Sequence, residues 1–537
     1  MSKYISVGMD YGMTVSGYEG YKNIQAVVKE MDRLGICQSV VEYNGLSNAL
    51  ACNKKLLADI DSVPNGRQRL IPAFNLNMGA LFQRGAMEQL VEMMENNRPH
   101  CVVLKPDSHG FQLMSIEEVL EKVKHLNPVI LINEKELRDP CTGVDDLVYL
   151  AKKFPNMRFV VRRFIFGGWN RAYNAARQAE NIYIDISRLH TMDAIDIACE
   201  HLGDHKVLWG HSRVSGMGAA MAAVTYADLS EESKDKVRWG NFVSLFSDPA
   251  DRACLMANLK ELPSKVANSF WAPFVEGKGF DACPIYDVHT HLGYTAVTAY
   301  VYDLTFEEQV ATFEKNMKRF NIKKIVSTVT GIHDPVECHQ LKEAAVKGKE
   351  DRFKGYIRYN PNYTDVFTEE YMDERFATGY YVGLKSLPHY MKVDLRDERY
   401  APMFEYAQKH SLPILIHNDM SKGSPKICAE MAAKYPNCKM LLGHSGGGDA
   451  GREQCHEIAK DPRYSNVYFE ICGSWLANSW TWKDSLEHID YTRVLFGTDA
   501  PVHSVVWELG HLLSEDIPDE QLIAILGGNA KRIFGFD

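Results

Sequence analysis

The chain has 537 residues, of which 45% are hydrophobic and 24% charged; this ordinary globular usage excludes disordered, collagenous and coiled-coil proteins. The formal net charge of -10 is spread along the chain without a basic block, which argues against a nucleic-acid partner. The amino terminus, MSKYISVGMDYGM, lacks the charged and apolar regions of a signal peptide, and no run of about 18 apolar residues predicts a membrane span.

Short apolar runs that predict β-strands recur in both halves of the chain. In the first half they are RLIPAFNLN (69–77), VVLKP (102–106), PVILINE (128–134), PNMRFVVRR (155–163), NIYIDI (181–186) and KVLWGHS (206–212). Each has a similar block in the second half, at 352–360, 382–386, 412–418, 436–444, 466–471 and 493–499. The offsets stay between 280 and 287 residues, so six blocks in order and in register indicate an internal duplication.

Amphipathic segments separate these strands. IEEVLEKVKHL (116–126) and SPKICAEMAAKY (424–435) both have apolar residues at helical spacing. Strand and helix alternating through about 250 residues is typical of a parallel α/β barrel. We therefore predict an α/β fold of two tandem (β/α)8 TIM-type barrels, at residues 1–246 and 282–537, joined by a connector at 247–281.

The stretch CPIYDVHTHLG (283–293) opens the second half and carries the first metal-ligand pattern. Side chains alternate along a strand, so Asp287, His289 and His291 should point into the same barrel lumen. Two imidazoles at this spacing can hold one borderline-soft cation such as zinc. By itself the HxH pattern is equally compatible with two ordinary histidines on a strand.

Three later strands of the second half also end in possible ligands. ILIHND ends in His417, MLLGHSGGG reaches His444, and VLFGTDAP reaches Asp499. The chemistry of a barrel lies at the carboxyl ends of its strands, where several strands converge. We therefore expect these side chains to meet the two strand histidines at one mouth of the second barrel.

The DxHxH start, the two single histidines, the closing GTD and the terminal GGNAKRIFG (527–535) resemble the amidohydrolase superfamily. More narrowly, they resemble the amidohydrolase-related group of metal-dependent hydrolases and aminocarboxymuconate-semialdehyde decarboxylase-like enzymes. The resemblance covers residues 283–537 directly and residues 1–246 only through the repeat. It implies one divalent ion per chain, zinc, with ligands at His289, His291, His417 and Asp499.

The resemblance also assigns roles in the reaction. A bound cation lowers the pKa of water from 15.7 to about 7, and Asp499 would both ligate the ion and take that proton. His444 would stabilise an oxyanion or shuttle a proton. Lys385, in GLKSLP, matches a strand-end lysine that in some relatives is carboxylated and bridges two metals, so its role stays open.

Three functions compete. The first is hydrolysis of an amide, ester or lactone bond of a small molecule. The second is metal-dependent, non-oxidative decarboxylation of a small carboxylic acid, which is a lyase reaction. The third, a non-catalytic binding protein made of two barrels, is disfavoured by the complete set of ligand candidates. Candidate substrate contacts are Arg358, His389, Trp475, Trp480 and the aromatic loop 294–303, which would suit a small carboxylated or cyclic molecule.

The first half keeps the strands and lacks the ligands. Alignment of Gly12 with Gly293 predicts a degenerate barrel that holds no metal. This barrel would either take the place of the second subunit of a dimer or only pack against the active half and stabilise it. Formation of a homo-oligomer stays open. The aligned pairs are Gly8 with His289, Asp10 with His291, Lys105 with Lys385, Asn133 with His417, Arg163 with His444 and Ser212 with Asp499.

The twelve cysteines do not form a disulfide framework, because such frameworks belong to short secreted domains. The sequence has no CxxC pair, the motif typical of thiolate zinc sites and of thioredoxin-type redox chemistry. We expect small buried thiols in a reducing compartment and a cytoplasmic location.

Overall fold

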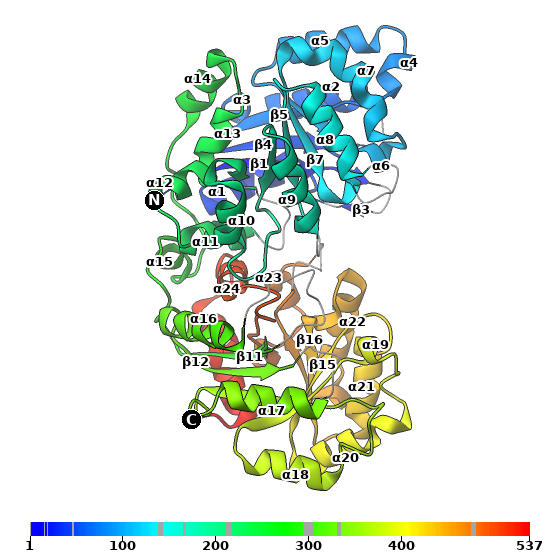
Figure 1. Ribbon diagram of the computed structural model, residues 1–537, viewed down its shortest axis with the longest axis vertical. Helices are drawn as coiled ribbons and strands as arrows, with labels where there is room; N and C mark the ends of the chain where they lie inside the picture. Colours follow the sequence, from blue (N-terminus) through cyan, green and yellow to red (C-terminus); the bar gives the residue numbers. More distant parts are fainter. Residues whose placement is uncertain are drawn as a thin grey trace. The chain divides into compact units, whose positions relative to one another are not determined.

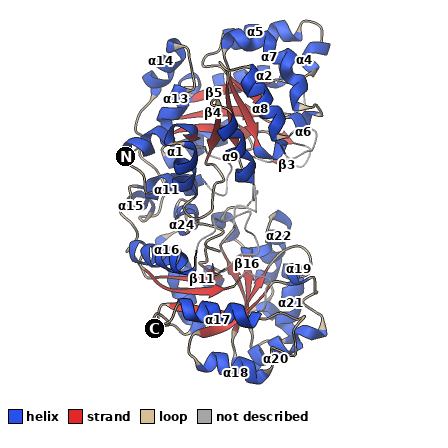
Figure 2. Ribbon diagram, in the orientation of Figure 1, coloured by secondary structure: helices blue, strands red, loops and turns tan. Residues whose placement is uncertain are grey.

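The computed structural model describes residues 2–14, 17–18, 20–45, 48–137, 143–164, 168–210, 217–293, 305–329, 335–473 and 480–537. The chain forms two compact units, Met1–Val266 and Ala267–Asp537. In each unit, helices surround a sheet of eight strands (Figures 1 and 2).

The first unit is a barrel of eight parallel strands that pair in chain order. A hydrogen bond from the Val7 amide to the Trp209 carbonyl (3.2 Å) joins the first strand to the end of the last and closes the barrel. The strands are β1 (Ile5–Tyr11), β4 (Gln38–Tyr43), β5 (Leu70–Asn75), β6 (Cys101–Leu104), β7 (Val129–Asn133), β8 (Arg158–Arg162), β9 (Ile182–Asp185) and β10 (Val207–Leu208).

The helices of this unit follow the strands along the chain. They are α1 (Ile24–Leu34), α2 (Ala49–Asp61), α3 (Gly66–Arg69), α4 (Gly79–Phe82), α5 (Ala86–Glu95), α6 (Pro106–His109), α7 (Glu117–Val123), α8 (Val144–Lys153), α9 (Gly168–Gln178), α10 (Ala194–Leu202), α11 (Met217–Tyr226), α12 (Glu231–Asp235), α13 (Asn241–Ser244) and α14 (Pro249–Asn258). A short antiparallel pair, β2 (Met13–Thr14) and β3 (Gly17–Tyr18), follows β1.

The second unit repeats this plan. Hydrogen bonds from the Val288 amide to the Phe496 carbonyl (3.1 Å) and from the His291 amide to the Ala500 carbonyl (2.6 Å) close its barrel. The strands are β11 (Ile285–His291), β12 (Ile322–Thr328), β13 (Phe353–Arg358), β14 (Tyr381–Ser386), β15 (Pro413–His417), β16 (Lys439–Gly443), β17 (Val467–Glu470) and β18 (Val494–Leu495).

The helices of the second unit surround this barrel. They are α15 (Trp271–Val275), α16 (Phe306–Arg319), α17 (Pro335–Ala345), α18 (Glu369–Ala377), α19 (Pro388–Met391), α20 (Ala401–His410), α21 (Pro425–Lys434), α22 (Asp449–Lys460), α23 (Trp482–Ser485), α24 (Val505–Leu513), α25 (Asp519–Ile523) and α26 (Asn529–Phe534). The two tandem barrels predicted from the sequence are therefore confirmed, as are the predicted helical segments at 116–126 and 424–435.

The core of the second barrel is apolar toward the amino ends of the strands. Val288, Leu415, Leu441 and Leu495 pack there against Ile533 of α26. All seven residues of β11 are buried, as expected for a strand covered on both faces. The buried polar side chains of β11 are thus left to gather at the opposite, carboxyl end of the barrel.

The predicted connector, 247–281, spans the division between the two units. Its first part belongs to the first barrel, because Leu255, Leu259 and Leu262 pack on that core and the Gln38 side chain donates to the Leu255 carbonyl (2.9 Å). The domain boundaries drawn from the sequence remain predictions. Within the described part of the chain, every helix is too short or too polar to cross a membrane.

Candidate metal centre

Three predicted ligands meet at the carboxyl end of the second barrel. His289 and His291 come from β11, and Asp499 follows β18. Asp499 Oδ1 lies 2.6 Å from His291 Nε2 and 3.4 Å from His289 Nε2, and all three side chains are buried. Two imidazole nitrogens and one carboxylate oxygen form a donor set that zinc and similar divalent cations accept.

The charge states of these groups suit a cation. Burial by itself would raise the pKa of Asp499, but attraction to His291 and His289 outweighs it and holds this pKa well below its usual range. Burial lowers the pKa of both histidines. These directions favour an ionised carboxylate and neutral imidazoles, which are the forms that bind metal.

Asp287 shares β11 with the two histidines and has a different task. Its carboxylate accepts hydrogen bonds from the Thr498 amide (3.1 Å), the Thr498 hydroxyl (2.6 Å) and the His289 amide (3.2 Å). Burial raises its pKa to about 8. Asp287 therefore fastens the GTD turn to β11, and Asp499 sits in that turn with a φ of 59°, a left-handed conformation in which Asp is enriched.

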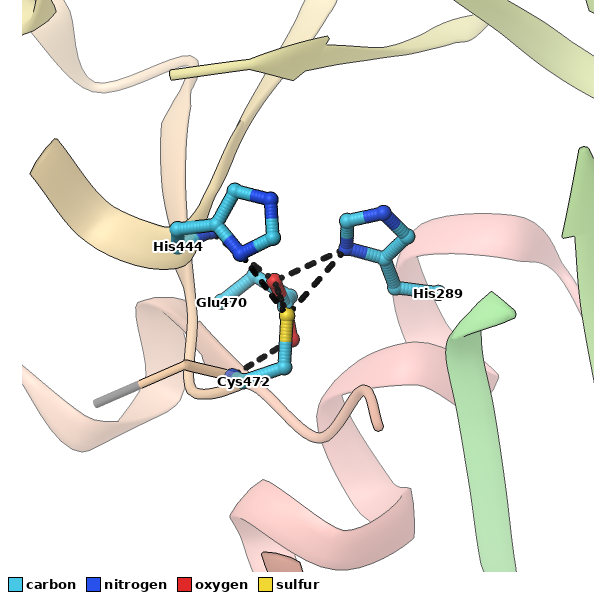
Figure 3. A group of neighbouring side chains, drawn as sticks. All are labelled: His289, His444, Glu470 and Cys472. Carbon is cyan, nitrogen blue, oxygen red and sulfur yellow. Dashed lines mark hydrogen bonds and ion pairs between the residues drawn. The ribbon is translucent and has the colours of Figure 1, made fainter. Parts of the chain in front are cut away.

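A second group lies behind His289 and contains Glu470 and Cys472 (Figure 3). Glu470 Oε2 is 3.1 Å from His289 Nδ1 and accepts hydrogen bonds from the His444 amide (3.1 Å) and the Cys472 thiol (2.8 Å). Cys472 Sγ lies 3.4 Å from His289 Nδ1 and 3.3 Å from His444 Nδ1. Figure 3 shows the two imidazoles on either side of this acid and thiol.

These four side chains are also of metal-ligand types, but their geometry favours a supporting role. The oxygens of Glu470 are already occupied by hydrogen bonds, and the group meets His289 through Nδ1 rather than Nε2. An acid at Nδ1 fixes the tautomer that turns the lone pair of Nε2 to the first group, a common arrangement around metal-binding histidines. Lys385 Nζ lies 3.0 Å from that Nε2, as expected for a nitrogen that accepts.

The sequence analysis missed Glu470 and Cys472. A signal was available in the repeat, because NVYFEI aligned with NIYIDI places Glu470 opposite Asp185. The structure shows the same contact in both halves: Asp185 accepts the Arg163 amide (3.1 Å) as Glu470 accepts the His444 amide (3.1 Å). In both barrels an acid at the end of the seventh strand therefore holds the turn that follows the sixth strand.

The other predicted residues of the centre lie close by. His417 Nδ1 is 3.1 Å from His444 Nε2, so His417 contacts His444 and lies outside the group of three. Burial lowers the pKa of His417 to about 4 and holds that of His444 well below its usual range. Lys385 is fully buried, and burial lowers its pKa to about 8.

The predicted substrate contacts fall into two sets. Arg358 is buried at the end of β13, in register with Lys385 of β14. His389 is instead exposed and faces Asp419 (3.4 Å), and Trp480 stacks edge-on against His456. Trp475 and the loop 294–303 lie outside the described residues.

In the first barrel, two arginines occupy the region that corresponds to the candidate metal centre of the second. A Cβ atom built on Gly8 would lie 1.9 Å from Nη1 of Arg162, so this guanidinium fills the space that His289 fills in the second barrel. Arg163 pairs with Asp10 (2.7 Å). Among the described residues, the candidate metal groups all belong to the second barrel; Ser212 is not among those residues.

Comparison with known proteins supports the class of the second barrel. The family model described as amidohydrolase matches residues 286–536. The match to the amidohydrolase model thus spans the second barrel, from β11 to α26. A search of the curated proteins gave no match.

Solved structures similar to this chain include three bacterial decarboxylases. They are 5-carboxyvanillate decarboxylase from Sphingomonas paucimobilis (15% identity, 48% of this chain and 100% of that chain, TM-score 0.37), 2,6-dihydroxybenzoate decarboxylase from Rhizobium (15%, 47% and 99%, 0.36) and a manganese-bound dihydroxybenzoic acid decarboxylase from Polaromonas (15%, 47% and 97%, 0.37). Similarity at this level does not extend to the substrate of this chain.

Proposed function

We propose that the second barrel is a metal-dependent hydrolase that cleaves an amide, ester or lactone bond of a small molecule. One divalent ion, zinc, would be held by His289, His291 and Asp499, with His417 as the fourth ligand. The observation that carries the proposal is the buried group of two neutral imidazoles and one ionised carboxylate, with donor atoms within 4.8 Å of one another.

A bound divalent cation supplies a Lewis acid that polarises a carbonyl and makes water more acidic. Asp499, ionised and at the barrel mouth, accepts the proton of the attacking water. His444 lies with its Nδ1 3.3 Å from the Cys472 thiol and its Nε2 3.1 Å from His417 Nδ1, so His444 would pass a proton to the leaving group. Glu470 keeps His289 in the required tautomer.

Non-oxidative decarboxylation is the second candidate, and a separate observation favours it. Arg358 and Lys385 are buried basic residues paired on neighbouring strands, and Lys385 Nζ contacts His289, an arrangement that suits a carboxylate substrate. In that reaction the carbon–carbon bond breaks, carbon dioxide leaves, and a proton is added to the substrate carbon. The release of carbon dioxide or of a new carboxylic acid separates the two reactions.

Metal analysis of the purified full chain tests the proposal. We expect about one divalent ion per chain, loss of the ion in His289→Ala, and retention in the matched variant His456→Ala, whose histidine stacks on Trp480 away from the group. Asp10→Ala, in the first barrel, should keep the ion as well. Protein purified without chelator that holds no metal would refute the enzyme function.

A further inference from the structure

Three neighbouring strands of the second barrel end in buried polar atoms that have no hydrogen-bond partner among the described residues. They are His291 Nδ1 on β11, Thr328 Oγ1 on β12, and Nε and Nη1 of Arg358 on β13. The exposed fractions of these residues are 4%, 0% and 2%. Buried polar groups are nearly always hydrogen-bonded, so three adjacent exceptions at the barrel mouth indicate a missing polar ligand.

The register shows that these side chains face one side of the sheet. His291 is paired with Thr328, and Arg358 is paired with Lys385, whose Nζ contacts His289 inside the barrel. Arg358 therefore faces the same side of the sheet as the side chains of the candidate metal centre.

Other buried arginines of this protein have partners. Arg452, 1% exposed, donates to the Ser445 carbonyl (3.2 Å) and the Ser485 hydroxyl (3.1 Å) and lies over the Trp482 ring. For Arg358, in contrast, no ion pair with a described carboxylate is formed, and burial lowers its pKa to about 10. A guanidinium kept buried without an anion is costly to the fold, which is the expected signature of a side chain reserved for a ligand.

We propose that Arg358 binds the carboxylate of the substrate, with the Thr328 hydroxyl as a second donor and the Lys385 ammonium as a neighbouring charge. The planar fork of a guanidinium matches the two oxygens of a carboxylate, whereas a point charge does not. The substrate class is then a small carboxylate anion. This inference rests on the proposed function for the reaction, but the anion site itself does not depend on which bond is cleaved.

Binding to the full chain as purified tests the carboxylate site, with metal content measured on the same samples. The probes are acetate and benzoate, each compared with its neutral amide, and inorganic phosphate. We expect the two acids to bind wild type more tightly than their amides, and Arg358→Gln to lose about tenfold to a hundredfold in affinity for the acids with unchanged metal content. Arg352→Gln, an exposed arginine paired with Glu314 (2.8 Å), is the matched control and should bind as wild type does.

Stability supplies a second readout, because a structural arginine and a ligand-binding arginine predict opposite results. Arg358→Met removes an unpartnered buried cation, so its thermal midpoint should equal or exceed that of wild type. A lower midpoint, acids that bind wild type and Arg358→Gln equally, or phosphate bound more tightly than the acids would overturn the inference. Arg358-dependent binding in protein that holds no metal would uphold the anion site while refuting the proposed metal-dependent function.

Discussion

At two equivalent strand positions, each barrel has one large side chain and one glycine, and the large side chain is on opposite strands in the two barrels. Adding a single methyl group to the glycine of the first barrel tests this arrangement. In the second barrel a Cβ atom on Gly443 of β16 would lie 3.3 Å from His289 Cε1. In the first barrel the repeat places Arg162 at the position of Gly443 and Gly8 at the position of His289. Gly8→Ala should therefore collide with the Arg162 guanidinium.

The cost follows from what holds this guanidinium. Arg162 is fully buried, donates to the Val7 carbonyl (3.1 Å), and pairs with Glu42 (2.7 Å). A Cβ at 1.9 Å from Nη1 leaves no room, so the guanidinium must move off these partners. Overpacking costs about 1–3 kcal/mol, and a displaced charged hydrogen bond adds about 1.5–3 kcal/mol. At about 2–4 °C per kcal/mol, the first unit should melt several degrees lower.

Calorimetry of the full chain, with hydrogen exchange at β1 and β8, measures this loss. The control is Gly240→Ala, a helical glycine of the same unit where the nearest atom to a new Cβ is 3.4 Å away. Alanine is favoured over glycine in a helix by up to about 1 kcal/mol, so this control should not lower the midpoint. A Gly8→Ala protein as stable as wild type would show that Arg162 does not fill the former ligand space.

Three further predictions concern acidic groups. Asp499→Asn keeps an oxygen ligand and loses the base, so turnover should fall at least about a hundredfold while metal content stays near wild type; near-normal turnover would shift the base to His444. Glu470→Gln places an amide donor against His289 Nδ1 and should weaken metal affinity by about 10–100-fold in a chelator competition, and unchanged affinity would contradict the supporting role. Burial favours a raised pKa for Glu42, but Arg162, Lys105 and Arg163 outweigh it and lower this pKa below the usual 4.5. Its stabilising effect is thus complete above about pH 4.5 and is lost as pH falls through the lower folded pKa, and acid unfolding curves of Glu42→Gln should show a smaller loss over that range.

Much of the fold could be predicted from the sequence because parallel strands buried on both faces are apolar runs, and six such runs recur in order. The same regularity located the mouth of the second barrel. His289, His291 and Asp499 each end or follow a strand, and the carboxyl ends of parallel strands converge. Local pattern and barrel geometry together were enough to predict this meeting.

The parts of the site that the sequence did not predict depend on contacts between distant residues. Glu470 lies in an apolar run that looks like core; the repeat pairs it with Asp185, but its role toward His289 follows from a contact between residues 181 positions apart. Arg162 and Gly8 are likewise 154 positions apart in the chain, so no local pattern links them. The role proposed for Arg358 depends on its guanidinium atoms having no hydrogen-bond partner among the described residues. That can be judged only when the positions of its neighbours are known.

The two halves also show which part of the site is scaffold and which is chemistry. In both barrels the residue after the sixth strand has a left-handed backbone, with φ of 59° at Arg163 and 67° at His444, and its amide is held by an acid from the seventh strand. That contact persists although the first barrel holds arginines and the second histidines. The role common to both barrels is therefore that the acid of the seventh strand fixes the turn after the sixth strand. In the second barrel Glu470 also contacts His289 and orients it. A buried guanidinium and a bound metal ion both place positive charge among buried acids. The same barrel is therefore compatible with either, and the side chains on β1 and β11 determine whether it holds an arginine or would hold a metal ion.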